Sequence, residues 1–241
     1  MKLLGILPFI ISFIFLIILI YQRIKNERKF SADIGLANNA VFGKDILTGI
    51  TIGLFAMSGI FAVELFLKSI HISGLNPVTL KWFISLFVLI ISAGIEEILF
   101  RGIIFGGLLR ITRTWIAILL ASLLFGIAHA GNPNANLISV INNALGGLMY
   151  SVAFLYTRSL WLPFSLHFSW NFFQGLVFGF PVSGYNFGGI INQITVGSTW
   201  LTGGDYGPEG GLIGMFFRVV IILLLYLYKN HRRTILSPNQ P

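Results

Sequence analysis

The stretch WFISLFVLIISAGIEEILFRGIIFGGL, at residues 82–108, is the most informative part of this chain for its fold class. It is apolar over almost its whole length, and its charged residues are limited to Glu96, Glu97 and Arg101. The hydrocarbon core of a bilayer is about 30 Å thick and needs about 20 such residues in a helix. The stretch therefore predicts a transmembrane helix that carries three ionisable side chains at membrane depth.

Apolar segments of the same kind lie on both sides of this stretch, at residues 3–21, 46–67, 115–130, 137–156, 160–180 and 212–228. Of the 241 residues, 56% are hydrophobic and only 10% are charged, whereas soluble domains carry about 25% charged residues. We predict an all-α fold, a polytopic bundle of about seven transmembrane helices. An eighth helix, formed within residues 181–211, is the alternative.

The polar stretches between these segments are too short to fold independently, so we expect a single bundle without a soluble domain. Along the chain it divides into N-terminal transmembrane helices with a cytoplasmic loop (1–81), a core that contains the polar clusters described below (82–180), and an outer loop with the last helix and a basic tail (181–241). The first segment is expected to remain as a helix, because its apolar run exceeds that of a signal peptide and its basic residues follow it.

Lysine and arginine residues between the segments predict the orientation, since loops rich in them stay in the cytoplasm. Eleven fall on one side: Arg23, Lys25, Arg28, Lys29, Lys44, Arg110, Arg113, Arg158, Lys229, Arg232 and Arg233. Three fall on the other: Lys2, Lys68 and Lys81. We expect a multi-pass protein of the cell membrane with an outer N-terminus, a cytoplasmic C-terminus, and outer loops at 130–136 and 181–211. These topology signals account for the net charge of +8, so the bilayer is an expected partner and nucleic acid is not.

Ionisable groups at membrane depth are costly and need a partner, a wet cavity or a function. Glu97 and Arg101 are four residues apart in a predicted helix, so they share a face and can form an ion pair. Glu96 points about 100° away from Glu97, and its unpaired carboxylate suits a general acid or base. The alternative is a structural network of all three side chains. The absence of cysteine excludes thiolate metal sites and a cysteine nucleophile.

Two histidines lie on other predicted helices. His167 and Asn171 are four residues apart, so they project toward one place, where they can hold a carbonyl or a water. His129 ends the 115–130 segment, about 21 Å from Trp115, next to the polar stretch 131–136. Either that segment begins obliquely in the interface, or the loop after His129 dips into a wet cavity. One glutamate and two histidines can hold or activate water, with or without a metal.

Two more ionisable residues and two glycine pairs in the apolar segments are interpreted as structural. Glu64 and Arg218 lie near the predicted outer side, where they could pair across helices. The pairs Gly106-Gly107 and Gly146-Gly147 indicate close helix contacts.

The three clusters, in this order, resemble the signature of the CPBP family of intramembrane proteases, which includes the type II CAAX prenyl endoproteases and bacterial homologues linked to bacteriocin processing or self-immunity. The family's Glu-Glu-x-x-x-Arg is similar to residues 96–101, its Phe-x-x-x-His to Phe125–His129, and its His-x-x-x-Asn/Asp to His167–Asn171. The resemblance covers about residues 82–180, and the stretch 202–210 resembles a loop of many bacterial members.

This resemblance implies a role for each matching residue. Glu96 would be the base that activates water, and His129 would help to position it. His167 and Asn171 would stabilise the oxyanion, while Glu97 and Arg101 would support the site and contact the substrate's terminus. The family has been described both as metalloproteases and as glutamate-dependent proteases.

We favour the scheme that requires no cofactor. Zinc held by Glu96, His129 and His167 is the alternative, but Glu97 would then have to act as the base while paired to Arg101. The expected partner is a membrane-associated protein or peptide substrate.

Two functions of other classes compete with an intramembrane endopeptidase. One is a non-catalytic membrane adaptor or bacteriocin-immunity protein, in which the polar cluster only holds helices together. The other is a transporter with a proton-carrying carboxylate, which the lack of a repeat pattern disfavours.

Overall fold

The computed structural model describes residues 18, 34–36 and 42–236, with side chains placed up to residue 228. Most of the predicted segment 3–21 and the end of the basic tail lie outside the described residues. The longer helices are α3 (Phe42–Phe66), α4 (Leu80–Glu97), α5 (Gly106–Ile111), α6 (Thr114–Ala128), α7 (Leu137–Thr157), α8 (Trp161–Asn171) and α10 (Leu212–Leu236). The all-α prediction is confirmed, and the chain is a multi-pass membrane protein.

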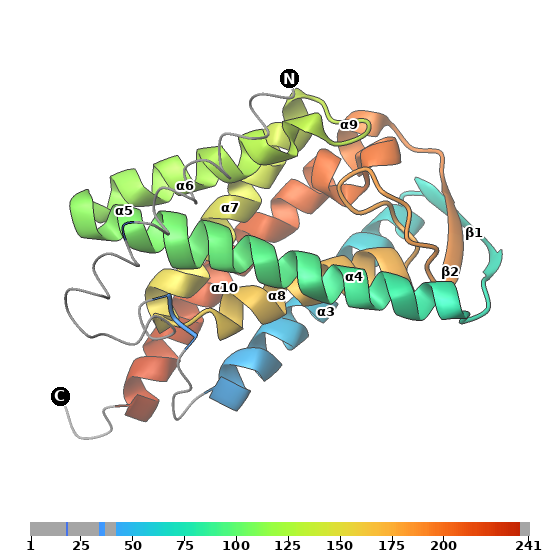
Figure 1. The fold of residues 1–241 in the computed structure, drawn as a ribbon. Coiled ribbons are helices and arrows are strands. Elements are labelled where there is room, and N and C mark those ends of the chain that lie inside the picture. The colour runs from blue at the N-terminus through green and yellow to red at the C-terminus, as the bar shows by residue number, and fades with distance from the viewer. Residues whose placement is uncertain (1–17, 19–33, 37–41, 237–241) are drawn as a thin grey trace.

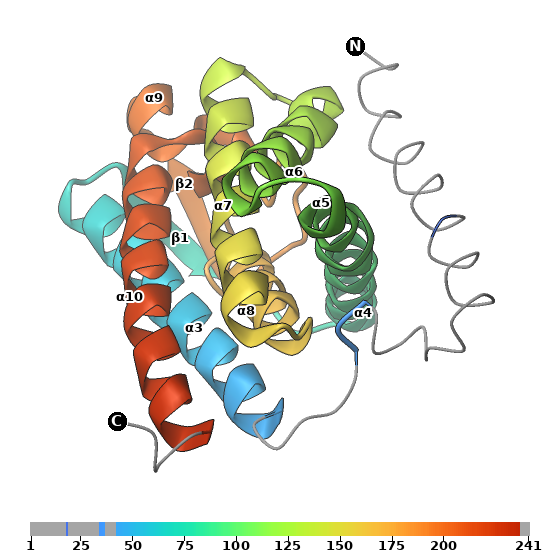
Figure 2. The ribbon, with the colours of Figure 1, turned by 90° about the vertical axis from the view of Figure 1, so that its left-hand side faces the viewer.

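Four helical stretches of the described part are long and apolar enough to cross a membrane: Phe42–Phe66, Leu80–Ile111, Thr114–Gly131 and Leu137–Thr157. They agree with four of the predicted segments. The segment predicted at 212–228 is also an apolar helix, Leu212–Tyr228, although it is shorter. Figure 2 shows α7 and α8 in the middle, with α3 and α10 on one side and α4, α5 and α6 on the other.

Two helices change from α to π geometry directly after residues with predicted roles. α4 ends at Glu97 and continues as the π-helix η1 (Ile98–Phe105). α8 ends at Asn171 and continues as the π-helix η3 (Phe172–Val177). π geometry is rare in proteins, and where it occurs it is often at a functional site. Its position in these two helices therefore agrees with a site between them.

The position of α8 is fixed by close packing on α3. A Cβ atom added to Gly49 would lie 2.1 Å from the Ser165 hydroxyl, and one added to Gly53 would lie 2.1 Å from the Ser169 hydroxyl. The two helices therefore run parallel at a separation that only glycine permits. Ser169 also donates a hydrogen bond to the Gly49 carbonyl at 3.1 Å. This contact places the side chains on the other faces of α8 accurately within the bundle.

The packing of α6 on α7 confirms the close contact predicted for Gly146-Gly147. A Cβ added to Gly147 would lie 2.9 Å from the Cβ of Phe125 and from the Cα of Ser122. One added to Gly146 would lie 3.1 Å from the guanidinium carbon of Arg218. Small residues thus let α6 and α10 approach α7 from two sides.

One end of the bundle carries a small sheet that the sequence did not predict. Strand β1 (Ile70–Leu75) pairs antiparallel with β2 (Ile191–Thr195), from Ile70 opposite Thr195 to Leu75 opposite Ile191. In Figure 1 the sheet lies at the N-terminal end of α4. The rest of the loop contains the single-turn helix α9 (Thr199–Thr202) and the 3-10 turns η4 (Gly204–Tyr206) and η5 (Pro208–Gly210). The extra helix left open for 181–211 is therefore this one turn.

The predicted pairing of Glu64 with Arg218 is wrong. Arg218 instead donates to Glu209, with 2.9 Å between Nη2 and Oε1, because η5 ends just before α10 and brings Glu209 to the first turns of that helix. Glu64 is fully buried, and neither of its carboxylate oxygens has a hydrogen-bond partner among the described residues.

Candidate active site

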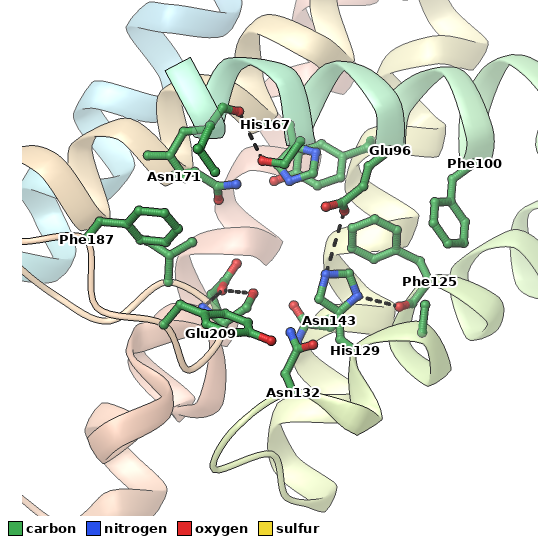
Figure 3. Close-up of a pocket in the computed structure, with 18 of the residues that line it drawn as sticks. Glu96, Phe100, Phe125, His129, Asn132, Asn143, His167, Asn171, Phe187 and Glu209 are labelled. Atoms are coloured by element: carbon green, nitrogen blue, oxygen red, sulfur yellow. Dashed lines mark hydrogen bonds and ion pairs between the residues drawn. The ribbon is translucent and has the colours of Figure 1, made fainter. Parts of the chain in front are cut away.

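The predicted catalytic residues meet at a cavity of about 490 Å³. Glu96 reaches it from α4, His129 from the end of α6, and His167 and Asn171 from α8. Figure 3 shows these four side chains around the cavity. Sequence motifs separated by about 70 residues are thus gathered at one place, and a cavity of this size can hold a ligand.

Glu96 and His129 face each other across a short gap. His129 Nε2 lies 3.7 Å from Glu96 Oε2, which is too long for a direct hydrogen bond. That oxygen is buried and has no direct partner among the described residues, while the Glu96 side chain as a whole is 30% exposed. The two atoms are therefore close enough for one small polar group beside them in the cavity to contact both the carboxylate and the imidazole.

The ring of His129 is oriented by the backbone of its own helix. Its Nδ1 lies 2.8 Å from the Phe125 carbonyl oxygen. Because a carbonyl only accepts hydrogen bonds, Nδ1 must carry a proton. In the neutral ring, Nε2 is then an acceptor directed toward Glu96.

Glu97 is placed quite differently from its neighbour. Its Oε1 accepts from Arg101 Nη1 at 3.2 Å and from His167 Nδ1 at 2.7 Å, and its side chain is only 1% exposed. The ion pair with Arg101 agrees with the predicted spacing. Neither Glu97 nor Arg101 lines the cavity, so in this structure they support the site and do not reach a ligand bound there.

Aromatic rings enclose the buried cation. The guanidinium carbon of Arg101 lies 4.4 Å from the centre of the Phe125 ring and 4.9 Å from that of Tyr150. Tyr150 also stacks on His167, with centroids 4.6 Å apart and planes at 18°. Cation–π contacts of this kind are strong when desolvated. The same residues therefore stabilise Arg101 and hold the His167 ring in place.

His167 and Asn171 occupy one face of α8, as predicted. They are 5% and 7% exposed and both line the cavity. Glu97 accepts from His167 Nδ1, so that nitrogen carries a proton. Nε2 is consequently the ring nitrogen available to a ligand, and it becomes a donor when the ring is protonated.

The part of the chain that the structure describes contains no group of three histidine, aspartate or glutamate residues that could hold a metal ion. Glu96, His129 and His167, the set expected for zinc, line the cavity but are not such a group. Both histidines use Nδ1 for contacts with the protein, to Glu97 and to the Phe125 carbonyl, and keep Nε2 for other partners.

The loop after His129 lies at the cavity, since Asn132 belongs to its lining. Of the two alternatives for His129, the loop that dips toward a wet cavity agrees better with this position. The 3-10 turn η2 (His129–Gly131) makes the bend.

Several lining residues were not identified from the sequence. They are Asn132, Asn143, Tyr150, Ser183, Phe187 and Glu209. Asn143 donates to the Tyr206 hydroxyl at 2.7 Å, and burial raises the pKa of Tyr206. Two adjacent amides, Asn142 and Asn143, within an apolar segment were a usable signal, because polar groups at membrane depth require partners. The loop residues carried no comparable signal.

Comparison with known proteins gives two sequence matches. The family model described as "Type II CAAX prenyl endopeptidase Rce1-like" matches residues 77–173, a range that contains all three motifs. A Bacillus subtilis (strain 168) protein, described as "Putative membrane peptidase YdiL", is 36% identical over 98 residues. The alignment covers 40% of this chain and 37% of that relative.

No solved structure matches the chain. The family match contains Glu96, His129, His167 and Asn171 and does not include residues 181–211. The three motifs, which meet at one cavity, lie within the part of the chain that is similar to the type II CAAX prenyl endopeptidase Rce1-like family, residues 77–173.

Proposed function

We propose that this chain is an intramembrane endopeptidase that hydrolyses peptide bonds of membrane-associated or lipid-proximal proteins with a water activated by Glu96. The observation that carries the proposal is the Glu96 carboxylate at the cavity, 3.7 Å from His129 Nε2. The family match of residues 77–173 and the similarity to a protein described as a membrane peptidase support this reaction class.

The gap between Glu96 and His129 suits a water molecule. Both facing atoms accept hydrogen bonds while the ring is neutral, so one water can donate a hydrogen to each. Glu96 removes a proton as the water oxygen attacks the carbonyl carbon of the substrate. His129 keeps the water oriented, because its Nδ1 is held by the Phe125 carbonyl.

His167 and Asn171 then stabilise the tetrahedral intermediate. As the new C–O bond forms, the carbonyl electron pair moves to oxygen, and donors already in place lower the energy of that charge. Asn171 supplies an amide N–H, and protonated His167 supplies Nε2–H while Glu97 holds Nδ1. Glu96 finally returns the proton to the leaving nitrogen as the C–N bond breaks.

The scheme requires no metal. Glu97 would have to be the base in the zinc alternative, and it is bound to both Arg101 and His167 away from the cavity. We expect cleavage by the purified protein to continue in the presence of a chelator. Loss of cleavage that zinc restores, together with stoichiometric zinc in the protein, would support the metallopeptidase instead.

The test uses the purified chain in lipid nanodiscs with a mixture of membrane-spanning and juxtamembrane peptides. Wild type should generate new termini, and Glu96→Gln should not. Asp205→Asn is the matched control, because this exposed outer-loop residue loses a carboxylate away from the cavity. If Glu96→Gln cleaved as well as wild type, a non-catalytic adaptor or immunity role would become the better account.

A further inference from the structure

One wall of the cavity comes from a segment outside the family match. Val182, Tyr185 and Phe187 line the cavity and follow η3 in the chain. Val182 is 5% exposed and packs on Gly175, where an added Cβ would lie 2.7 Å from Val182 Cγ2. Gly175 is four residues beyond Asn171, so this wall is built against the helix that carries a proposed oxyanion donor.

Residues 182–185 of this wall form a tight turn that is closed by two backbone hydrogen bonds. Val182 and Tyr185 each donate their backbone N–H to the other's carbonyl, at 2.8 and 2.9 Å. Ser183 lies between them with φ of 48°, a left-handed conformation that is uncommon for a residue other than glycine. A turn closed in this way holds its side chains in defined directions.

The turn is fixed from two sides. Gly184 donates to the Tyr206 carbonyl at 3.0 Å, and a Cβ added to Gly184 would lie 2.0 Å from the Pro133 carbonyl oxygen. Gly184 therefore packs between the loop that follows His129 and the turn η4. The wall is thus in contact with the loop next to His129 as well as with the helix that continues from Asn171.

Glu209 anchors the turn to the helices. Its Oε2 accepts from the Ser183 backbone N–H at 2.8 Å and from the Ser183 hydroxyl at 2.6 Å. Its Oε1 accepts from Arg218, which also donates to Asn142 Oδ1 at 2.9 Å. Charge-assisted bonds of this kind are short and directional, so α7 and α10 fix the position of the turn through Glu209.

The surface between the turn and α4 is apolar. Val88 and Leu89 of α4 line the same cavity as Val182 and Phe187. Figure 3 draws Phe187 and Asn171 on one side of the cavity and Glu96 and His129 on the other. The Glu209 carboxylate accepts hydrogen bonds from Arg218 and Ser183. The apolar side chains of this surface therefore remain available to contact a substrate side chain.

We propose that Val182 and Phe187, with Val88 and Leu89, form a subsite for an apolar side chain of the substrate next to the cleaved bond. Glu209 is the positioning residue that holds this subsite through Ser183. The inference rests on the proposed endopeptidase function and adds the residues that select the substrate. Removal of apolar surface from water favours such binding, and the size of the pocket limits which side chain fits.

The test is a series of quenched membrane peptides that vary only in the residues flanking the cleaved bond: alanine, leucine, phenylalanine or aspartate. Wild type should prefer an apolar residue to aspartate on one side of the bond by about 10-fold or more in kcat/KM. Phe187→Ala should enlarge the subsite and shift the ratio of kcat/KM toward phenylalanine over leucine by about 10-fold. Phe187→Leu, a milder change, should shift it in the same direction.

Phe216→Ala is the matched control, because Phe216 is 62% exposed on α10 and does not line the cavity; its preferences should equal those of wild type. Ser183→Ala keeps the ion pair of Glu209 and Arg218 but loses the hydroxyl bond, so it should raise KM for the preferred peptide more than it lowers kcat.

The outcomes separate the two proposals. Glu96-dependent cleavage with the same ranking of peptides in wild type and both Phe187 variants would overturn the subsite and leave the peptidase intact. Cleavage that does not depend on Glu96 would overturn the peptidase and the subsite together.

Discussion

Glu96 and Glu97 are neighbours in the chain, yet their carboxylates have different surroundings. Glu96 lines the cavity and faces His129 at 3.7 Å, whereas Glu97 is 1% exposed and accepts from both Arg101 and His167. A turn of about 100° per residue separates the two side chains on α4. One helix thereby supplies one carboxylate that faces the cavity and a second that is bound to Arg101 and His167.

Glu97→Gln should destabilise the protein. It leaves the buried Arg101 guanidinium without its counter-charge, and breaking a buried pair costs about 3–5 kcal/mol. Glu96→Gln should have little effect on stability, because among the described residues that carboxylate has no ion-pair contact shorter than 3.7 Å. Thermal unfolding of both variants in the same detergent checks the difference. Equal unfolding temperatures would contradict the assigned roles.

His129→Gln should lower kcat about 100-fold or more while KM changes little, because the residue acts on the water and not on the substrate. Peptide cleavage in nanodiscs measures both constants. His71→Gln is the control, since His71 is exposed on β1 and should behave as wild type. A rise in KM without a fall in kcat would indicate a substrate-binding role instead.

Arg218→Met and Glu209→Gln should each lower the free energy of unfolding. The double variant should lose less of this free energy than the sum of the two single losses. The two side chains are 1% and 5% exposed and lie 2.9 Å apart, so each single change leaves a buried partner unpaired. Unfolding midpoints of the four proteins give the coupling, expected at about 1 kcal/mol or more. Additive costs would mean that the pair does not act as a unit.

The loop that follows His129, which lines the cavity through Asn132, should lie on the outer side of the membrane. The chain has no cysteine, so single substitutions report topology without background. A membrane-impermeant maleimide added to intact cells should label Asn134→Cys, in the loop after His129, and not Thr114→Cys, at the start of α6. Both residues are exposed. The reverse pattern would show that the excess of basic residues had been assigned to the wrong side.

Contacts within one helix could be predicted from the sequence because helical geometry relates residues four apart. The pair of Glu97 with Arg101 agrees with that expectation, and Glu96 is separate from it. The meeting of the three motifs was expected from the family resemblance. The close approach at Gly147 followed from small residues in an apolar segment.

Contacts between distant parts of the chain could not be predicted in this way. The bond from His167 to Glu97 joins residues 70 positions apart, and spacing alone does not specify which helices become neighbours. Arg218 was expected to pair with Glu64 because both were near the outer side, but η5 provides a closer carboxylate in Glu209. The wall formed by Val182 and Phe187 depends on how the loop at 181–211 folds back onto the helices, which no periodic pattern encodes.

The central claim is that Glu96 activates water to cut membrane-associated proteins. The most direct test compares, in cells, the N- and C-terminal peptides of membrane proteins produced with the wild-type chain and with Glu96→Ala at equal abundance, by mass spectrometry. A defined set of termini should disappear with the glutamate, and those termini would identify the substrate and the cleaved bond. Identical profiles would contradict the claim.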